Sequence, residues 1–258
     1  MTVKHVGNIK AIVVDLDRTL LHTDKSISAY TLGVLKKCRE KGIKIMVATA
    51  RPLRASQQYC DEIAPDAVVV SNGARVICGD QRTDYAIGPK SAADLLNALG
   101  RYPSMRITLE TGENAYSNLP VADYETVLID DLVRVTREEA ILKVLVHLDE
   151  ADTLGLVARE LGDALYYSIS IGYLMQIMDT SATKWNGIQA MLKACGCEPA
   201  EAAYFGDDHD DVEPIKMCGL GIAVSNAIEE VKAAADFIAE SNDVDGVARF
   251  IEQNLLND

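Results

Sequence analysis

The chain has 258 residues, of which 48% are hydrophobic and 25% charged, and this composition excludes a fibrous or intrinsically disordered protein. Lysine and arginine number 25 against 39 aspartate and glutamate residues, so the formal net charge is −14. Because a strongly acidic chain repels phosphate backbones and anionic lipid, we expect neither nucleic acid nor a membrane as its main partner.

The first 80 residues alternate short apolar runs with amphipathic segments. A helix is predicted over 28–41, and Pro52 stands where a second helix would open. The apolar runs have the length and continuity of buried parallel strands. They cover Ala11–Val14, 43–48 and Ala67–Val70. This alternation predicts right-handed crossovers and a doubly wound parallel sheet.

Residues 83–182 show a different pattern, with turn signals between short apolar runs. A strand at 141–148 and helices at 91–99 and 151–161 are expected. Two hairpins are predicted as well, one pairing 105–109 with Ala115–Ser117 and one pairing 165–170 with 173–178. Hairpins beside helices indicate an α+β module with an antiparallel sheet.

After about residue 183 the first pattern returns. The predicted strands are 202–205, 221–224 and 236–239, and the predicted helices are 187–194, 227–235 and 247–255. The fold class is therefore predicted to be α/β, with a doubly wound parallel sheet formed by 1–82 and 183–258. An inserted α+β domain of 83–182 interrupts it.

The cysteines and the N-terminal segment bear on the compartment. The apolar run before Asp15 has only four residues, shorter than a secretory signal needs. The six cysteines show neither C-x-x-C nor zinc-ligand spacing, which favours reduced thiols in the cytoplasm. The Cys-Gly-Cys at 195–197 leaves a redox or metal site as the alternative.

Polar residues follow four of the predicted strands of the parallel sheet, at the strand ends where ligands bind in such folds. They are 15–20 after the first strand, 49–52 after the second, 71–74 after the third and 206–211 after the strand at 202–205. Crowded carboxylates repel one another, and a divalent cation would compensate them. Taken alone, each piece is also consistent with a turn or a helix cap.

In this order the strand ends resemble the four motifs of the haloacid dehalogenase superfamily of phosphotransferases. The matching residues are Asp15-x-Asp17-x-Thr19, Thr49, Lys184 and Gly206-Asp207-x-x-x-Asp211. The long interval from Thr49 to Lys184 leaves room for a cap domain, as in the Cof-type subfamily. Segments 71–74, 221–227 and 245–248 also resemble that subfamily. The resemblance implies a Rossmann-like core carrying an inserted cap.

The resemblance implies covalent catalysis by two aspartates. Asp15 would attack phosphorus and form an aspartyl phosphate. Asp17 would protonate the leaving oxygen and then deprotonate the attacking water. Mg²⁺ would bind Asp15, the Asp17 carbonyl and Asp207, and would neutralise charge in the transition state.

Phosphate binding is implied for Thr49, the Ala50 N–H and Lys184, with Lys184 also pairing with Asp15. Supporting roles are expected for four further residues, Arg51, Asn72, Asp210 and Asp211.

Four positions depart from the family pattern. Ala50 stands where the second motif usually has glycine, a mild change. Arg18 stands where glycine is usual, and its cation would lie at the entrance of the site. Trp185, the single tryptophan, follows Lys184, where glycine is frequent. Asp210 replaces an asparagine, and its carboxylate could face either the metal ion or Lys184; of the two, we expect an ion pair with Lys184.

The sequence thus predicts a Mg²⁺-dependent phosphatase that acts on a small phosphorylated metabolite, such as a sugar phosphate, through an aspartyl phosphate. The cap would exclude bulky substrates and set specificity. A phosphomutase and a non-catalytic regulator that binds a phosphorylated ligand are the alternatives. The sequence predicts no particular oligomeric state.

Overall fold

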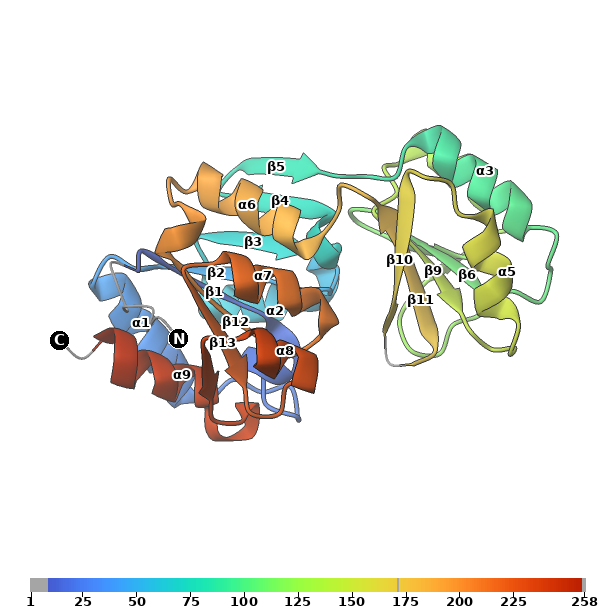
Figure 1. Ribbon diagram of the computed structural model, residues 1–258. Helices are drawn as coiled ribbons and strands as arrows, with labels where there is room; N and C mark the ends of the chain where they lie inside the picture. The colour runs from blue at the N-terminus through green and yellow to red at the C-terminus, as the bar shows by residue number, and fades with distance from the viewer. Residues whose placement is uncertain (1–8, 171, 257–258) are drawn as a thin grey trace. The chain divides into compact units, whose positions relative to one another are not determined.

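The computed structural model describes residues 9–170 and 172–256, which form two compact units (Figure 1). One unit contains the chain up to Arg51, Ala55–Thr83 and the chain from Thr183 onward; the other contains Pro52–Arg54 and Asp84–Ala182. The longer segment of the second unit begins one residue after the predicted insert of 83–182 and ends with it. A search of the described residues for a helix long and apolar enough to span a membrane finds none.

The first unit is built on an eight-stranded sheet. Across the sheet the strands are β14 (Phe237–Ala239), β13 (Leu220–Val224), β12 (Ala202–Gly206), β1 (Ala11–Val14), β2 (Lys44–Ala48), β3 (Ala67–Val70), β4 (Arg75–Cys78) and β5 (Gln81–Asp84). From β14 to β3 all pairs are parallel. The central strands are buried on both faces, which is why they are continuous apolar runs. The predicted α/β class is confirmed.

At one edge the sheet departs from the predicted parallel arrangement, because β4 is antiparallel to β3. The two strands are joined by the turn Ser71–Gly73, in which all three residues have positive φ. A connection this short reverses the chain, whereas a parallel neighbour needs a crossover of a dozen residues or more. The prediction missed β4 and β5 for this reason.

In the part of the chain that the structure describes, six helices flank this sheet. They are α1 (Ala29–Glu40), α2 (Leu53–Ile63), α6 (Lys184–Ala194), α7 (Val212–Met217), α8 (Glu229–Ala234) and α9 (Gly246–Ile251). Helix α6 packs on β3 and β4, and α7 packs on β12 and β13 (Figure 1). Helix α6 begins three residues earlier than predicted, because the side chain of Thr183 accepts the N–H of Asn186 at 3.1 Å and caps the helix. Lys184 is therefore the first residue of α6.

The second unit is a six-stranded sheet packed against three helices. Its strands, in order across the sheet, are β10 (Leu165–Ser170), β11 (Leu174–Asp179), β9 (Lys143–His147), β6 (Ile107–Glu110), β7 (Ala115–Ser117) and β8 (Val127–Leu128). Both predicted hairpins are confirmed. The helices are α3 (Pro89–Leu99), α4 (Leu132–Glu138) and α5 (Thr153–Glu160). Helix α4 was not predicted, because valines and a threonine make its seven residues look like a strand.

The two faces of this second sheet differ in chemistry because side chains alternate along each strand. On β9, Val144 and Val146 belong to the hydrophobic core formed with the three helices. Lys143 and His147, at the two ends of β9, lie on the opposite face of the strand and are buried polar groups. The Lys143 ammonium donates to Gln176 Oε1 on the neighbouring β11 at 2.5 Å. We call this side the polar face of the second unit.

Candidate active site

Asp15 and Asp207 lie together because β1 and β12 are parallel neighbours. Val14 pairs with Phe205, so the residues that follow each strand leave the sheet at the same edge. The Asp15 N–H donates to the Phe205 carbonyl at 3.0 Å, which extends the pairing by one residue. The edge therefore brings two carboxylates side by side, as the sequence predicted.

Asp211 completes this group and is held by four donors. Its Oδ1 accepts from the Lys184 ammonium and from the Tyr204 hydroxyl, each at 2.6 Å. Its Oδ2 accepts the backbone N–H groups of Asp207 at 2.8 Å and Asp208 at 3.0 Å. This approach requires Gly206, since a Cβ there would lie 2.5 Å from the Asp211 side chain. Burial would raise the pKa of Asp211, but Lys184 and the other donors lower that pKa below its usual value.

Lys184 links Asp211 to Asp15. Its ammonium donates to Asp15 Oδ1 at 3.1 Å as well as to Asp211 at 2.6 Å. Burial alone would lower the pKa of Lys184, but the two carboxylates outweigh burial and raise that pKa well above its usual value. Lys184 is therefore charged, and the sequence-based expectation that it pairs with Asp15 is confirmed.

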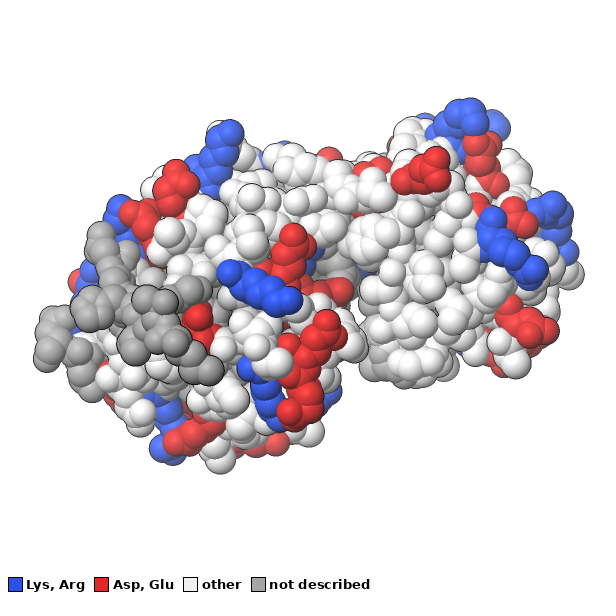
Figure 2. Space-filling view, in the orientation of Figure 1, with Lys and Arg blue, Asp and Glu red and all other residues white. Residues whose placement is uncertain are grey.

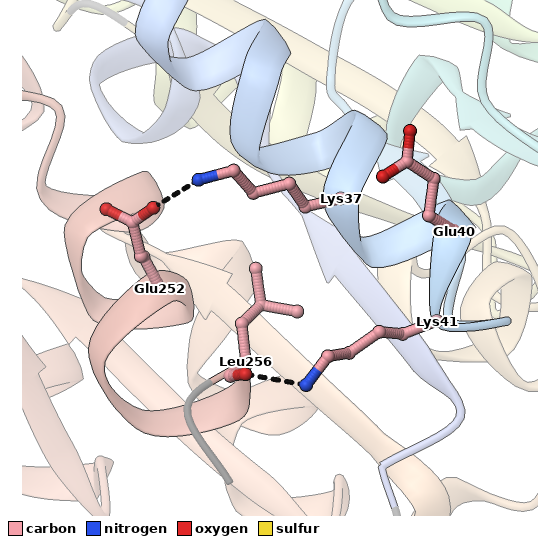
Figure 3. A pocket seen from close by; sticks show the side chains of 5 residues that line it. All are labelled: Lys37, Glu40, Lys41, Glu252 and Leu256. Atoms are coloured by element: carbon pink, nitrogen blue, oxygen red, sulfur yellow. Dashed lines mark hydrogen bonds and ion pairs between the residues drawn. The ribbon is translucent and has the colours of Figure 1, made fainter.

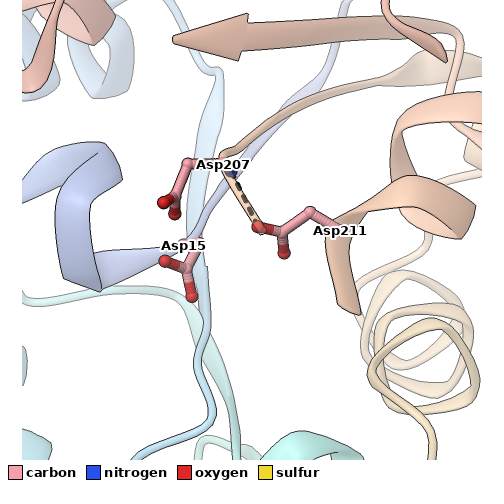
Figure 4. Close-up of side chains that lie close together, drawn as sticks. All are labelled: Asp15, Asp207 and Asp211. Atoms are coloured by element: carbon pink, nitrogen blue, oxygen red, sulfur yellow. Dashed lines mark hydrogen bonds between the residues drawn. The ribbon is translucent and has the colours of Figure 1, made fainter. Parts of the chain in front are cut away.

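The three carboxylates carry more negative charge than Lys184 can balance. Asp15, Asp207 and Asp211 have carboxylate oxygens within 4.8 Å of one another (Figure 4). Burial, and then the charge of Asp211, raises the pKa of Asp207 to about 6. Burial also raises the pKa of Asp15 well above its usual value, although Lys184 opposes the shift. Buried oxygen ligands with excess negative charge fit a hard divalent cation such as Mg²⁺.

The hydrogen bonds of the three carboxylates show which of them can bind a metal ion. Asp211 already accepts four hydrogen bonds, so its role is to position Lys184 and the 207–208 backbone. Asp207 accepts one bond, from the Thr19 hydroxyl at 3.0 Å, and its other oxygen lies 3.7 Å from Arg18 Nε. Asp15 and Asp207 therefore retain oxygens that can bind a cation.

The Asp17 carboxylate lies in a separate network. Arg51 donates to both of its oxygens, at 2.6 and 2.7 Å, and Lys25 donates to Oδ1 at 2.7 Å. Burial would raise the pKa of Asp17, but these two cations hold it below its usual value. The Arg51 guanidinium also lies over the Tyr59 ring, 5.2 Å from its centre. Asp17 is therefore ionised in this arrangement.

Thr49 and Asn72 lie at the ends of the adjacent strands β2 and β3. The Asn72 N–H donates to the Thr49 carbonyl at 3.3 Å, and Thr49 Oγ1 accepts the Arg51 N–H at 3.2 Å. Ala50 follows directly, between β2 and α2. The strand ends thus bring these predicted site residues together, and Thr49 and Asn72 are buried.

The expectation that Asp210 forms an ion pair with Lys184 is wrong. The Asp210 carboxylate instead accepts a hydrogen bond from the Asn72 amide. The partners of Lys184 are Asp15 and Asp211, which occupy the ammonium at shorter range. Asp210 acts on Lys184 only as a more distant charge that contributes to its raised pKa.

Sequence reasoning missed Tyr204, Lys25 and Asn226. Tyr204 is a polar side chain in an otherwise apolar buried strand, and this was a usable signal. Lys25 reaches Asp17 from a loop in which it adopts a positive φ of 69°, and no sequence pattern indicates that contact. Asn226 bonds to Arg18 from the loop after β13.

Other features of the first unit lie outside this group. Trp185 is buried in α6 and contributes to the core. A pocket of about 270 Å³ lies beside α1 and the C-terminal segment. Figure 3 shows that residues lining this pocket bind one another. Lys37 pairs with Glu252, and Lys41 donates to the Leu256 carbonyl, both at 2.6 Å. On the described residues of the face in Figure 2, basic and acidic side chains are interspersed among uncharged ones.

Comparison with known proteins agrees with this geometry. A family model of haloacid dehalogenase-like hydrolases matches residues 12–251. The chain is 27% identical over 261 residues to the 5-amino-6-(5-phospho-D-ribitylamino)uracil phosphatase YitU of Bacillus subtilis, covering 94% of this chain and 96% of that protein. It is 26% identical over 251 residues to a phosphoglycolate phosphatase of Methanococcoides burtonii, with coverages of 96% and 98%.

Solved structures give the same result. A haloacid dehalogenase-like hydrolase from Bacteroides thetaiotaomicron superposes with a TM-score of 0.85 at 25% identity, covering 95% of this chain and 99% of that one. Both the sequence match and the structural match span nearly the whole chain, so they include the four strand ends described above. The chain belongs to the haloacid dehalogenase-like hydrolase family.

Proposed function

We propose that this protein is a Mg²⁺-dependent phosphatase that hydrolyses a small phosphorylated metabolite through an aspartyl phosphate on Asp15. The observation that carries the proposal is the buried arrangement of Asp15, Lys184 and Asp207, in which a carboxylate lies beside a fixed cation and a second carboxylate. The phosphatase names of the relatives reported above support it.

In the first step an Asp15 oxygen attacks phosphorus, and the bond from phosphorus to the substrate oxygen breaks. Attack requires the ionised carboxylate, whose charge is disfavoured by burial. Lys184, at 3.1 Å, stabilises that ionised form and would pair with the phosphate oxygens as charge develops on them. Asp211 keeps the Lys184 ammonium in place through its 2.6 Å contact.

Asp17 would supply the proton that the leaving oxygen takes up. In the structure its carboxylate is paired with Arg51 and Lys25, which favour the ionised form. To act as an acid it must part from at least one of these cations and take up a proton before the first step. In the second step it would accept a proton from the water that attacks the aspartyl phosphate, which releases inorganic phosphate and regenerates Asp15.

Mg²⁺, when bound, supplies positive charge that balances the phosphate and the carboxylates. Asp15, Asp207 and the Asp17 carbonyl would hold it, and the Thr19 hydroxyl orients Asp207 by its 3.0 Å bond. The Thr49 hydroxyl and the Ala50 N–H would bind phosphate oxygens at the end of β2.

For the organic part of the substrate we propose a hydroxylated metabolite such as a sugar or polyol phosphate. We propose that the second unit selects it, because the polar face of that unit carries groups suited to hydroxyls. These include Lys143, Gln176 and His147, all buried in the structure. The relative YitU is named for a phosphoribityl substrate, which agrees with this class.

The test is a panel of phosphorylated sugars, polyols and short acids, assayed for inorganic phosphate with Mg²⁺ and with EDTA. We expect Mg²⁺-dependent release for several compounds and the highest kcat/KM for a hydroxylated one. Acid quenching during turnover, followed by peptide mapping, should locate phosphate on Asp15. Transfer of that phosphate to a second sugar instead of water would indicate a phosphomutase. No Mg²⁺-dependent turnover of any ester would leave a non-catalytic binding protein.

A further inference from the structure

We propose that Asn226 is a positioning residue for Asp17, acting through the backbone of Arg18. This inference rests on the proposed function, in which Asp17 is the acid and base. The Asn226 side-chain amide donates to the Arg18 backbone carbonyl at 2.7 Å, and Arg18 Nη2 donates to the Asn226 backbone carbonyl at 3.2 Å. Asn226 thus forms two hydrogen bonds with Arg18, the residue that directly follows Asp17 in the chain.

The turn around Arg18, to which Asn226 is hydrogen-bonded, is strained. Arg18 has φ 58° and ψ 8°, the left-handed conformation that glycine adopts freely and other residues disfavour. This conformation reverses the chain after Asp17, whose own dihedrals are extended at φ −69° and ψ 127°. The reversal lets Leu20 N–H donate to the Asp15 carbonyl at 3.2 Å and Leu21 N–H donate to the Leu16 carbonyl at 2.8 Å.

A second asparagine holds the other end of the same turn. The buried Asn242 donates its side-chain amide to the Leu21 carbonyl at 2.9 Å. Its backbone N–H donates to Asn226 Oδ1 at 3.0 Å, which fixes the orientation of the Asn226 amide. Arg18 O and Leu21 O, at the two ends of the turn, are therefore bound by one connected pair of asparagines.

Asn226 has no part in the carboxylate group itself. Among the described residues its side-chain and backbone contacts here are to Arg18 and Asn242. Without its amide donor the Arg18 carbonyl loses a partner, and a non-glycine residue in the left-handed region relaxes toward an extended or right-handed conformation. Rotation at Arg18 displaces the Asp17 carbonyl and side chain. Because Asp17 acts in the chemical steps, the loss affects their rate more than the binding of the substrate.

The discriminating variant is Asn226→Asp, which keeps the oxygen that accepts from Asn242 and removes the donor to Arg18. We expect kcat to fall about tenfold or more and KM to change less than about threefold, because an interaction specific to the chemical steps is lost. Asn254→Ala is the matched control, since Asn254 also donates its amide to a backbone carbonyl, that of Phe250, at 2.9 Å. Its kcat should equal that of the wild type.

Rescue separates positioning from general support of the fold. In an Arg18→Gly background the turn is no longer strained, so adding Asn226→Asp should lower kcat less than about twofold. The double variant also serves if Asn226→Asp alone does not fold. An equal loss of kcat in both backgrounds, or no loss in either, would overturn the proposal.

A measurement independent of turnover keeps this inference distinct from the proposed function. Hydrogen exchange of the Leu20 and Leu21 amides should be faster in Asn226→Asp than in the wild type and in Asn254→Ala. Arg18→Gly should restore slow exchange. If no phosphate ester is hydrolysed, the phosphatase assignment fails while the exchange result still decides the positioning of the turn. Unchanged exchange in Asn226→Asp refutes the inference even in an active phosphatase.

Discussion

Replacing Lys184 by methionine tests the electrostatics of the site, because it removes the ammonium that Asp15 and Asp211 share and keeps much of the side-chain volume. At an effective dielectric of 20, the gross attraction is roughly 5–6 kcal/mol for each contact, at 3.1 and 2.6 Å. Desolvation of the ammonium offsets much of this sum. Removing one partner of a buried ion pair costs about 3–5 kcal/mol, and we expect a loss in that range.

The assay is urea unfolding followed by circular dichroism, in EDTA and again with excess Mg²⁺. In EDTA the variant should lose about 3–5 kcal/mol of unfolding free energy. Mg²⁺ should recover part of the loss, because it supplies positive charge to the same carboxylates. Lys193→Met, at an exposed position of the same helix, should change stability by less than about 0.5 kcal/mol. A loss below about 1 kcal/mol for Lys184→Met in EDTA would refute the reasoning.

Three further predictions concern single residues. Asp15→Asn should stay folded and retain less than about a hundredth of wild-type kcat, because an amide cannot attack phosphorus; a higher residual rate argues against a nucleophile there. Asp207→Ala should raise the Mg²⁺ concentration needed for half-maximal turnover by about tenfold or more, and EDTA should silence the wild type; full activity in EDTA contradicts the metal site. Burial raises the pKa of Cys60 from 9.0 to about 11, so this thiol stays protonated at neutral pH, and its thiolate forms only as the pH approaches that value. Iodoacetamide should therefore alkylate Cys60 at neutral pH more slowly in the folded chain than in urea, as mass spectrometry can measure, and equal rates would show that the burial is overstated.

The strand ends were predictable because topology alone brings them together. Once Ala11–Val14 and Ala202–Gly206 are parallel neighbours, Asp15 and Asp207 must emerge at one edge, whatever their side chains do. Thr49 follows from the same argument on the next strand. Lys184 was predictable only from the resemblance, since it comes from the first turn of a helix that the apolar pattern starts three residues later.

Apart from the Lys184–Asp15 pair, which the resemblance implied, side-chain partners were not predictable, because they depend on local dihedral angles that composition does not reveal. Arg18, the residue after Asp17, has a positive φ. This conformation shapes the loop in which Asp17 accepts hydrogen bonds from Arg51 and Lys25. Asp210 was expected on Lys184 but bonds to Asn72. Moving a short side chain such as aspartate by one position along a turn points it in another direction, whereas the end of a strand stays at the same edge of the sheet.

Asp207 and Asp211 show how two carboxylates in one loop acquire opposite roles. Asp211 accepts four hydrogen bonds, two of them from Lys184 and Tyr204, and its pKa is lowered. Asp207 accepts one hydrogen bond and has its pKa raised to about 6. A rise from 3.8 to about 6 corresponds to on the order of 3 kcal/mol by which the folded chain disfavours the ionised form of Asp207. A divalent cation that binds the ionised form offsets this cost, whereas at Asp211 the protein has already provided the positive partners. The division of roles follows from these partners, and it makes Asp207, rather than Asp211, the carboxylate whose ionisation a bound cation would favour.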